Sequence, residues 1–384
     1  MRGLLLIIAS FGVTILAWGL YGVTLHEGQR IMSTEPGVYA RLRPFVCVGL
    51  AYFAIGVIAP AVLLATRGEK GTWTFRGIGM SLLAGAFGAI GALGIIMAFT
   101  FGGRPSFVMP LVFGGAPVVN SFLTIYWSKK VKEVGPLFLA GLVMVVLGAV
   151  TVLLFKPAPP KKSLAEATVS SVANDQSVAN DQAPAQAALA TPTIEAEVVQ
   201  EVQQASLFGG RFLLQLLSIA TVIGCWGAYG PVLHQGQAAM QQSRLRPLLC
   251  VGLAYFAIAV VVPWALLRTT LPEASEWNFV GTAWSLAAGA AGAIGALGII
   301  MAFNFGGRPI YVMPLVFGGA PVVNTFATII LQGQLNEVHP MFLAGLILVI
   351  AGAAMVLVFA PKGGPTPAAT QPAKALKAEP AQPS

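Results

Sequence analysis

Two apolar stretches of the chain share the heptapeptide Gly-Gly-Ala-Pro-Val-Val-Asn, at 114–120 and 318–324. If these stretches are helices, each proline removes a backbone donor and clashes with the carbonyl four residues earlier. Each closing asparagine offers an amide that can bind a solute without the cost of burying a charge. Interrupted helices at matching places in two halves of a chain are typical of a membrane transporter's binding site. The candidate solute-binding residues are therefore Gly115, Pro117, Asn120, Gly319, Pro321 and Asn324.

Four aromatic residues inside other apolar stretches are further candidates for the solute site. Trp18 and Trp226 occupy matching positions in the two halves of the chain, and so do Tyr52 and Tyr255. Their flat faces could line a cavity for a planar or apolar solute. Packing between helices, or anchoring at the membrane surface, is the structural alternative. The two asparagines have a structural alternative as well, because an amide can cap a freed carbonyl or bond a neighbouring helix.

Histidine and arginine residues stand where apolar stretches end. His26 and His234 lie in the repeated stretch Leu-His-x-Gly-Gln, and Arg104 and Arg308 lie in the repeated corner Gly-Gly-Arg-Pro. Histidine titrates near neutral pH and could gate a pathway, while the arginines could draw anions into each mouth. Polar helix ends in the head-group region, and tight turns whose arginine reaches for water, are the simpler interpretations.

Several kinds of chemistry find no support in the sequence. No Asp or Glu lies well inside an apolar stretch, which weakens the case for coupling to protons. The sequence contains no phosphate-binding loop, Ser-His-Asp set or cluster of metal ligands. We therefore expect no enzymatic activity, no cofactor and no bound metal. The basic residues form no patch interleaved with aromatics, so nucleic acid is not an expected partner.

The composition limits which fold can position these residues. Of 384 residues, 56% are hydrophobic and only 9% are charged, whereas a soluble domain has roughly 25% charged residues. So few charges cannot cover a water-soluble globule. The apolar runs are continuous rather than alternating, which disfavours a porin-type barrel. The sequence thus predicts an all-α integral membrane protein that is surrounded by the lipid bilayer.

Ten apolar runs have the length of about 20 residues that a membrane-spanning helix needs. They cover 3–23, 44–66, 77–101, 106–127, 136–156, 212–232, 247–268, 280–305, 310–331 and 340–360. The two sets of five correspond because the chain is an internal duplication, in which 88–120 recurs at 292–324 with three changes. Two consecutive five-span units must have opposite orientations in the membrane. We therefore predict ten transmembrane helices arranged as two inverted repeats.

The chain divides into four parts. The first five-helix repeat covers 1–156 and the second covers 209–361, while the polar linker 157–208 and the tail 362–384 are expected to be disordered. Basic residues in short loops favour an orientation with both ends of the chain inside. We therefore expect a multi-pass protein of the cell (inner) membrane with both termini in the cytoplasm.

In the order of its motifs the chain resembles the drug/metabolite transporter superfamily, in its EamA-like five-plus-five form. The resemblance rests first on a Trp-Gly pair in the first helix of each half and on the segments 104–120 and 308–324. It also rests on an acidic residue before a glycine-containing fifth helix. The residues concerned are Trp18, Gly19, Trp226, Gly227, Glu133, Gly141, Gly148, Glu337 and Gly345. The resemblance implies two five-helix repeats and transport of small molecules.

These features together predict a secondary transporter that moves a small metabolite by alternating access, with a central cavity between the repeats. Two alternatives stay open. The protein could export amphipathic compounds, or it could be a membrane scaffold or sensor that does not transport and binds a partner through the linker. The solute, the direction and the coupling ion are left open by the sequence, and a homodimer is compatible with it.

Overall fold

A computed structural model of the chain describes residues 2–35, 39–101, 105–129, 131–155, 210–269, 273–331 and 339–359. In this part every regular element is a helix, which confirms the all-α prediction. Seven helices are long and apolar enough to cross a membrane, and three shorter apolar helices cover Leu111–Trp127, Pro136–Val152 and Pro340–Val356. These helices indicate a multi-pass membrane protein. The predicted linker and tail lie outside the described residues.

The two halves of the chain have the same order of helices. The first half contains α1 (Arg2–Met32), α2 (Leu42–Phe53), η1 (Ala54–Ile58), α3 (Ala59–Thr66), α4 (Phe75–Thr100), α5 (Pro105–Ser128), η2 (Val131–Glu133) and α6 (Pro136–Leu154). The second half contains α9 (Gly210–Ala239), α10 (Leu245–Phe256), η3 (Ala257–Val261), α11 (Val262–Thr269), α12 (Phe279–Asn304), α13 (Pro309–Leu331) and α14 (Pro340–Phe359).

The first helix of each half is longer than its apolar run. Hydropathy predicts ends at 23 and 232, but α1 continues to Met32 and α9 continues to Ala239. The added turns contain the Leu-His-x-Gly-Gln stretch and pack against the other half. A Cβ atom placed on Gly28 would lie 2.2 Å from Ser285 Oγ of α12, and one on Gly236 would lie 2.4 Å from Ser81 Oγ of α4. The glycine of this stretch is therefore needed for close helix packing.

The second span of each half contains one wide π-helical turn, η1 between α2 and α3 and η3 between α10 and α11. Each turn comes just before a proline, Pro60 or Pro263. Proline has no N–H and clashes with the carbonyl four residues earlier, and a π turn accommodates this change of register. In η1 the N–H of Ala59 bonds back to Ala54 O, five residues earlier.

The halves interlock rather than pack as separate bundles. Helix α1 packs on α12 and α13 of the second half, and α9 packs in the same way on α4 and α5 of the first half. Helices α2 and α10 pack on each other, and each also packs on the other half's third span, α12 or α4. The contacts between the duplicated halves are thus reciprocal, element by element.

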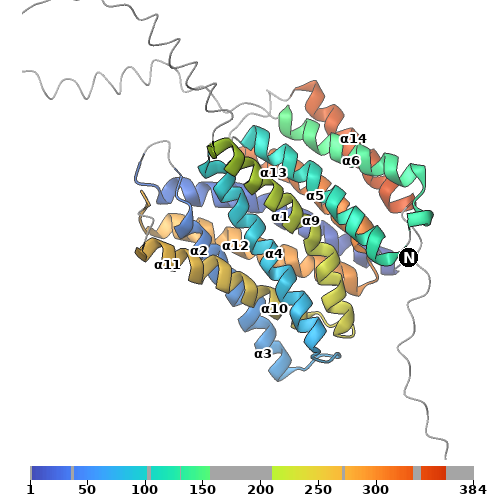
Figure 1. The fold of residues 1–384 in the computed structure, drawn as a ribbon, viewed down its shortest axis with the longest axis horizontal. Coiled ribbons are helices and arrows are strands. Elements are labelled where there is room, and N and C mark those ends of the chain that lie inside the picture. Colours follow the sequence, from blue (N-terminus) through green and yellow to red (C-terminus); the bar gives the residue numbers. More distant parts are fainter. Residues whose placement is uncertain are drawn as a thin grey trace, which may run out of the picture.

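The last helices, α6 and α14, lie side by side at one side of the bundle (Figure 1). Their contact depends on glycine, because an added Cβ on Gly148 would lie 2.6 Å from Val349 N and 2.7 Å from Gly345 O. An added Cβ on Gly352 would meet Val145 N at the same distance of 2.6 Å. Small residues at these positions let the two backbones approach closely, as in other helix pairs within membranes.

Candidate functional site

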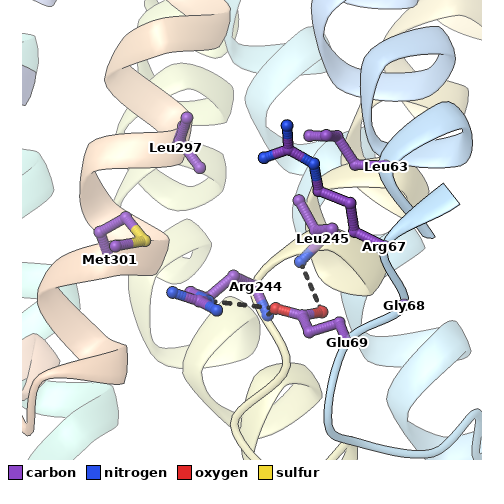
Figure 2. Close-up of a pocket in the computed structure, with 8 residues that line it drawn as sticks. All are labelled: Leu63, Arg67, Gly68, Glu69, Arg244, Leu245, Leu297 and Met301. Carbon is purple, nitrogen blue, oxygen red and sulfur yellow. Dashed lines mark hydrogen bonds and ion pairs between the residues drawn. The ribbon is translucent and has the colours of Figure 1, made fainter.

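A buried carboxylate joins the two halves at one end of the bundle. Glu69, in the loop after α3, accepts hydrogen bonds from the backbone N–H groups of Arg244 (2.8 Å) and Leu245 (3.1 Å) at the start of α10. It also accepts bonds from Ser243 Oγ (2.5 Å) and Arg244 Nε (3.1 Å), and it lies 3.6 Å from Arg246 Nη1. We call Glu69 and these four partners the first clasp; Figure 2 shows Glu69 with Arg244 and Leu245.

A second clasp repeats this arrangement with the halves exchanged. Glu273, in the loop after α11, accepts hydrogen bonds from the backbone N–H groups of Arg41 and Leu42 (2.9 Å) at the start of α2. Its other oxygen accepts a bond from Ser275 Oγ (2.8 Å) and lies 3.8 Å from Arg43 Nη1. In both clasps the carboxylate satisfies the free N–H groups of a helix start, where a negative charge is favoured.

The two clasps lie at opposite ends of α12. Leu297 and Met301, near the end of α12, line a cavity beside the first clasp. The start of α12 adjoins the second clasp, because Asn278 caps the helix through Gly281 N and donates a hydrogen bond to Ile31 O of α1. Each end of the bundle is therefore closed by a contact between the halves.

The first clasp predicts that stability depends on pH in the acid range. Burial alone would raise the pKa of Glu69, but bonds from Ser243 Oγ and the N–H groups of Arg244 and Leu245 outweigh burial and lower it from 4.5. A lowered pKa stabilises the folded state fully above about pH 4.5, and this contribution is lost as the pH falls through the folded value. We expect the unfolding temperature to fall below pH 4.5, and to fall less steeply in Glu69→Gln. Parallel pH profiles of the two proteins would contradict this assignment.

Each Trp-Gly pair lies between the clasps and packs the first helix of one half against two helices of the other half. Trp18 Nε1 donates a hydrogen bond to Gly292 O of α12 (3.1 Å), and Trp226 Nε1 donates one to Gly88 O of α4 (3.3 Å). The following glycine faces the neighbouring helix, since an added Cβ on Gly19 would lie 2.5 Å from a side-chain carbon of α13. In each half, the tryptophan therefore bonds to α12 or α4 of the other half. The glycine next to it allows α13 or α5 of the other half to pack closely.

The predicted aromatic residues meet at the centre of the bundle. The rings of Tyr52 and Tyr255 stack where α2 and α10 cross, with centroids 3.7 Å apart and planes within 3°. Trp18 approaches Tyr229 of α9 edge-on at 6.1 Å. We define the central aromatic cluster as Trp18, Tyr52, Phe113, Trp226, Tyr229, Tyr255 and Phe317. All seven side chains belong to or pack against the largest buried hydrophobic cluster that the described residues form.

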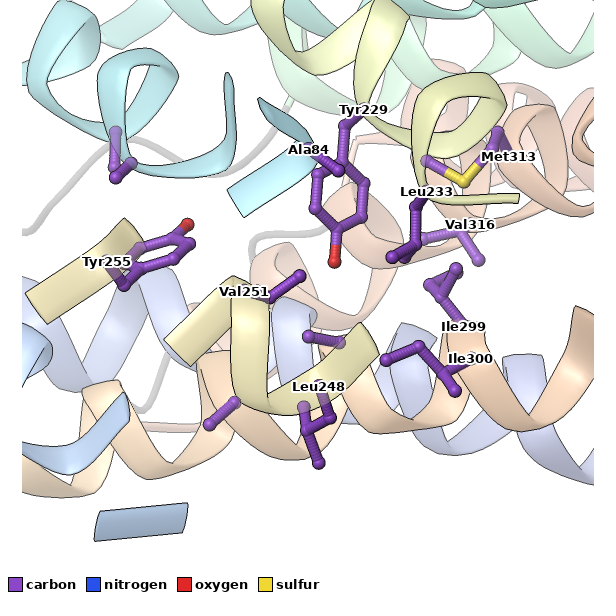
Figure 3. Close-up of a cluster of buried hydrophobic side chains, with 14 of the residues drawn as sticks. Ala84, Tyr229, Leu233, Leu248, Val251, Tyr255, Ile299, Ile300, Met313 and Val316 are labelled. Atoms are coloured by element: carbon purple, nitrogen blue, oxygen red, sulfur yellow. The ribbon is translucent and has the colours of Figure 1, made fainter. Parts of the chain in front are cut away.

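Tyr229 brings a polar atom into this cluster. Its side chain is 4% exposed, and its hydroxyl points among apolar side chains such as Val251 (Figure 3). Within the described residues the hydroxyl has no hydrogen-bond partner. The prediction from sequence did not include Tyr229 or its counterpart Tyr21, although the Trp-Gly-x-Tyr pattern recurs in both halves and could have identified them.

The two asparagines both face protein. Asn120 is fully buried, and its Nδ2 donates a hydrogen bond to Pro309 O at the start of α13 (2.9 Å). Its Oδ1 has no partner within the described residues. Asn324 lies against α1, because an added Cβ on Gly22 would be 2.5 Å from Asn324 Oδ1. For Asn120 the structure thus contains the bond to a neighbouring helix that the structural interpretation expects.

The prolines and glycines before the asparagines serve helix packing. Pro117 and Pro321 are buried within α5 and α13. An added Cβ on Gly115 would lie 2.8 Å from Ile223 of α9, and one on Gly319 would lie 2.8 Å from Ile15 of α1. These glycines therefore set the distance between the fourth span of one half and the first helix of the other.

The predicted mouth residues lie near the ends of the first helices. The ring of His26 is 4.8 Å from that of Tyr39, and the ring of His234 meets Phe303 edge-on at 5.2 Å. Arg308 lies in the corner between α12 and α13, one residue before Pro309. Arg104 lies outside the described residues.

Comparison with protein-family models and with curated proteins finds no match to this chain. A comparison with solved structures finds a crystal structure, described only as that of a protein, with a TM-score of 0.59 and 15% sequence identity. The alignment covers 92% of this chain and 97% of the other. At this identity the similarity extends to the fold alone.

Proposed function

We propose that the protein is a secondary membrane transporter that moves a small metabolite by alternating access between two inverted five-helix repeats. The observation that supports this most is the reciprocal packing of the halves, in which Trp18 bonds to Gly292 and Trp226 bonds to Gly88. Duplicated halves of this kind can exchange conformations by rocking about a shared centre. Because the central aromatic cluster packs within the buried core and a clasp closes each end, a solute enters only when the halves move apart.

The ends of the bundle support opposite orientations of the repeats. Trp73 and Phe75 are exposed beside the first clasp, and Trp277 and Phe279 are exposed beside the second. Exposed aromatic side chains at both ends of a bundle match the two interfaces of a membrane. The loops near the first clasp carry more basic residues, so this end faces the cytoplasm in our proposal, with both termini on the same side.

The chemistry of the centre favours an uncharged solute with flat or apolar surfaces. The sequence has no Asp, Glu, Lys or Arg in 3–26, 77–103, 212–243 or 279–307, so the charged residues of α1, α4 and α9 lie only near their ends and α12 has none. A charged solute would lose its hydration there without gaining a counter-charge. The rings offer stacking surfaces, while Tyr229 Oη and Asn120 Oδ1 offer polar atoms that have no bond within the described residues.

Tyr229→Phe tests this site without disturbing its packing. The substitution removes only a buried hydroxyl, and removing an unpaired polar atom is neutral or stabilising. If the hydroxyl binds the solute, we expect transport to fall about fivefold, since one hydrogen bond contributes about 1 kcal/mol and 1.4 kcal/mol is a factor of ten. Thermal unfolding should stay the same or shift upward.

The assay compares metabolite levels inside and outside cells that contain the protein, an empty vector or a variant, at matched amounts of protein in the membrane. Tyr126→Phe is the control, because Tyr126 lies on α5 and is 66% exposed. The double variant Asn120→Ala/Asn324→Ala tests the two amides in the same way. If folded protein moves no compound over a broad panel, the transport proposal fails and the scaffold interpretation replaces it.

A further inference from the structure

A cavity of about 270 Å³ lies beside the first clasp, at the seam between the two halves (Figure 2). The first half contributes the end of α3 and the following loop, and the second half contributes α12 and the start of α10. Its lining residues are Leu63, Arg67, Gly68, Glu69, Arg244, Leu245, Leu297 and Met301. This volume is just below the lower limit of about 300 Å³ for ligand pockets, so it suits a small group or one end of a larger ligand.

Two guanidinium groups at this cavity can bind an anion. Arg67 is exposed, and its side chain has no hydrogen bond or ion pair within the described residues; Figure 2 shows it extending from the end of α3 toward α12. Arg244 uses Nε for Glu69, and among the described bonds its two terminal nitrogens make none. Glu69 forms its ion pairs with Arg244 and Arg246, and the described residues show no ion pair between Glu69 and Arg67. Arginine suits a phosphate because its fork of N–H donors matches the phosphate oxygens.

The rest of the cavity is apolar and lies at the ends of two candidate membrane spans. Leu63 is 37% exposed and belongs to the candidate span Leu42–Thr66, which ends just before Arg67. On the opposite side, Leu297 and Met301 belong to the last turns of the candidate span Phe279–Asn304. The arginines therefore stand at the membrane surface, with apolar side chains extending from them toward the hydrocarbon region.

The other end of the bundle differs from this end at one cation. At equivalent positions of the repeat, the other end has Arg41, Leu42 and Leu266 where this end has Arg244, Leu245 and Leu63. It has Thr270 where this end has Arg67. The nearby Arg268 stacks on Trp264, with its guanidinium carbon 4.1 Å from the ring centroid. The position of Arg67 thus holds an arginine only at the first-clasp end, while the exposed arginine nearest to it at the other end, Arg268, is stacked on an aromatic ring.

We propose that this cavity binds the anionic head group of a phospholipid between Arg67 and Arg244, with the start of an acyl chain against Leu63, Leu297 and Met301. This site is separate from the central aromatic cluster, and it does not depend on whether the protein transports a solute. The lipid would contact both halves at once and hold this end of the bundle together. An anionic lipid is also the ligand expected beside a basic membrane face.

The test measures lipid retained by the purified full-length protein with native mass spectrometry. The protein is exchanged into nanodiscs with equal amounts of phosphatidylglycerol and phosphatidylcholine and then released into detergent. We expect the wild type to retain phosphatidylglycerol in preference to phosphatidylcholine. In Arg67→Thr, which copies the other end of the chain, this preference should fall about fivefold, because one arginine near an anionic surface contributes about 1 kcal/mol. Arg67→Glu should abolish it.

Arg268→Thr is the matched control, since it removes an arginine from the other end and should change the preference less than twofold. Unchanged retention in Arg67→Thr, or an equal loss in Arg268→Thr, would overturn the proposal. Inorganic phosphate distinguishes a lipid from a free anion. If phosphate raises the unfolding temperature of lipid-free protein in an Arg67-dependent manner and displaces the lipid, the cavity is a site for free anions and the lipid assignment is wrong.

Discussion

The variant Glu69→Ala is expected to lose about 3–5 kcal/mol of unfolding free energy, the usual effect of removing one partner from a buried ion pair. The Glu69 side chain is only 6% exposed. Its removal leaves the N–H groups of Arg244 and Leu245, the Ser243 hydroxyl and the Arg246 guanidinium without their shared acceptor. Arg246 is itself 12% exposed, so water replaces the carboxylate only in part.

Unfolding of the purified protein in a mild detergent, followed by circular dichroism, measures this loss. Glu27→Ala is the control, because Glu27 pairs with Arg30 at the protein surface, where the two side chains are 32% and 59% exposed. Such a pair contributes about 0–1 kcal/mol. Glu273→Ala, at the second clasp, should resemble Glu69→Ala. If Glu69→Ala unfolds like Glu27→Ala, the first clasp does not hold the halves together.

The same variant connects stability to the proposed transport cycle. A movement that opens the bundle at the first clasp must separate Glu69 from the start of α10, because one is in the first half and the other in the second. Weakening one clasp but not the other should therefore favour the conformation that is open at that end. Under our proposal, Glu69→Ala and Glu273→Ala shift this conformational balance in opposite directions.

Helices and their repetition could be predicted from the sequence because both depend on local information. The hydropathy of ten runs and the near-identity of 88–120 with 292–324 can be read without any knowledge of contacts. The ends of α1 and α9 could not be predicted from hydropathy, since their last turns are stabilised by the other half. The Leu-His-x-Gly-Gln pattern marks these last turns, but its meaning becomes clear only from the contact between Gly28 and Ser285.

The two clasps could not be predicted from the sequence, for a different reason. Glu69 and Glu273 lie in polar loops, where an acidic residue ordinarily indicates nothing more than exposure to water. Their partners are far away along the chain, with Ser243 lying 174 residues after Glu69. The second clasp takes its serine, Ser275, from the loop of the carboxylate itself. The serine therefore comes from different positions in the two clasps, although the carboxylate and the Arg-Leu-Arg stretch recur in both halves.

Two of the glycines on each of α4 and α12 face rings of the central aromatic cluster, whereas Gly85 and Gly289 face the backbones of α10 and α2. An added Cβ on Gly88 would lie 2.8 Å from the ring of Tyr255, and one on Gly91 would lie 2.2 Å from Trp226. In the other half Gly292 and Gly295 receive Tyr52 and Trp18 at the same distances. The glycines thus form a groove for aromatic rings on each third span.

Gly91→Ala should consequently destabilise the protein and displace Trp226. The new methyl group would clash with Trp226, because its carbon would lie 2.2 Å from both Cδ1 and Nε1 of the indole. The indole cannot move away without losing its hydrogen bond to Gly88 O. Overpacking of this kind costs about 1–3 kcal/mol, and the broken hydrogen bond adds about 1 kcal/mol. The expected result is a loss of about 2–4 kcal/mol in unfolding free energy, together with a changed tryptophan fluorescence.

Gly79→Ala makes the same substitution in the same helix and should have the opposite effect. A Cβ on Gly79 would meet nothing within 4 Å. Alanine has less freedom to lose than glycine when it enters a helix, so this variant should be unchanged or more stable by about 0.5–1 kcal/mol. The pair separates steric conflict at the tryptophan from any general effect of altering α4. Equal stability of the two variants would mean that Trp226 does not lie in this groove. A loss confined to Gly91→Ala would tie the Trp-Gly pair of one half to the third span of the other, the contact on which the proposed movement of the halves depends.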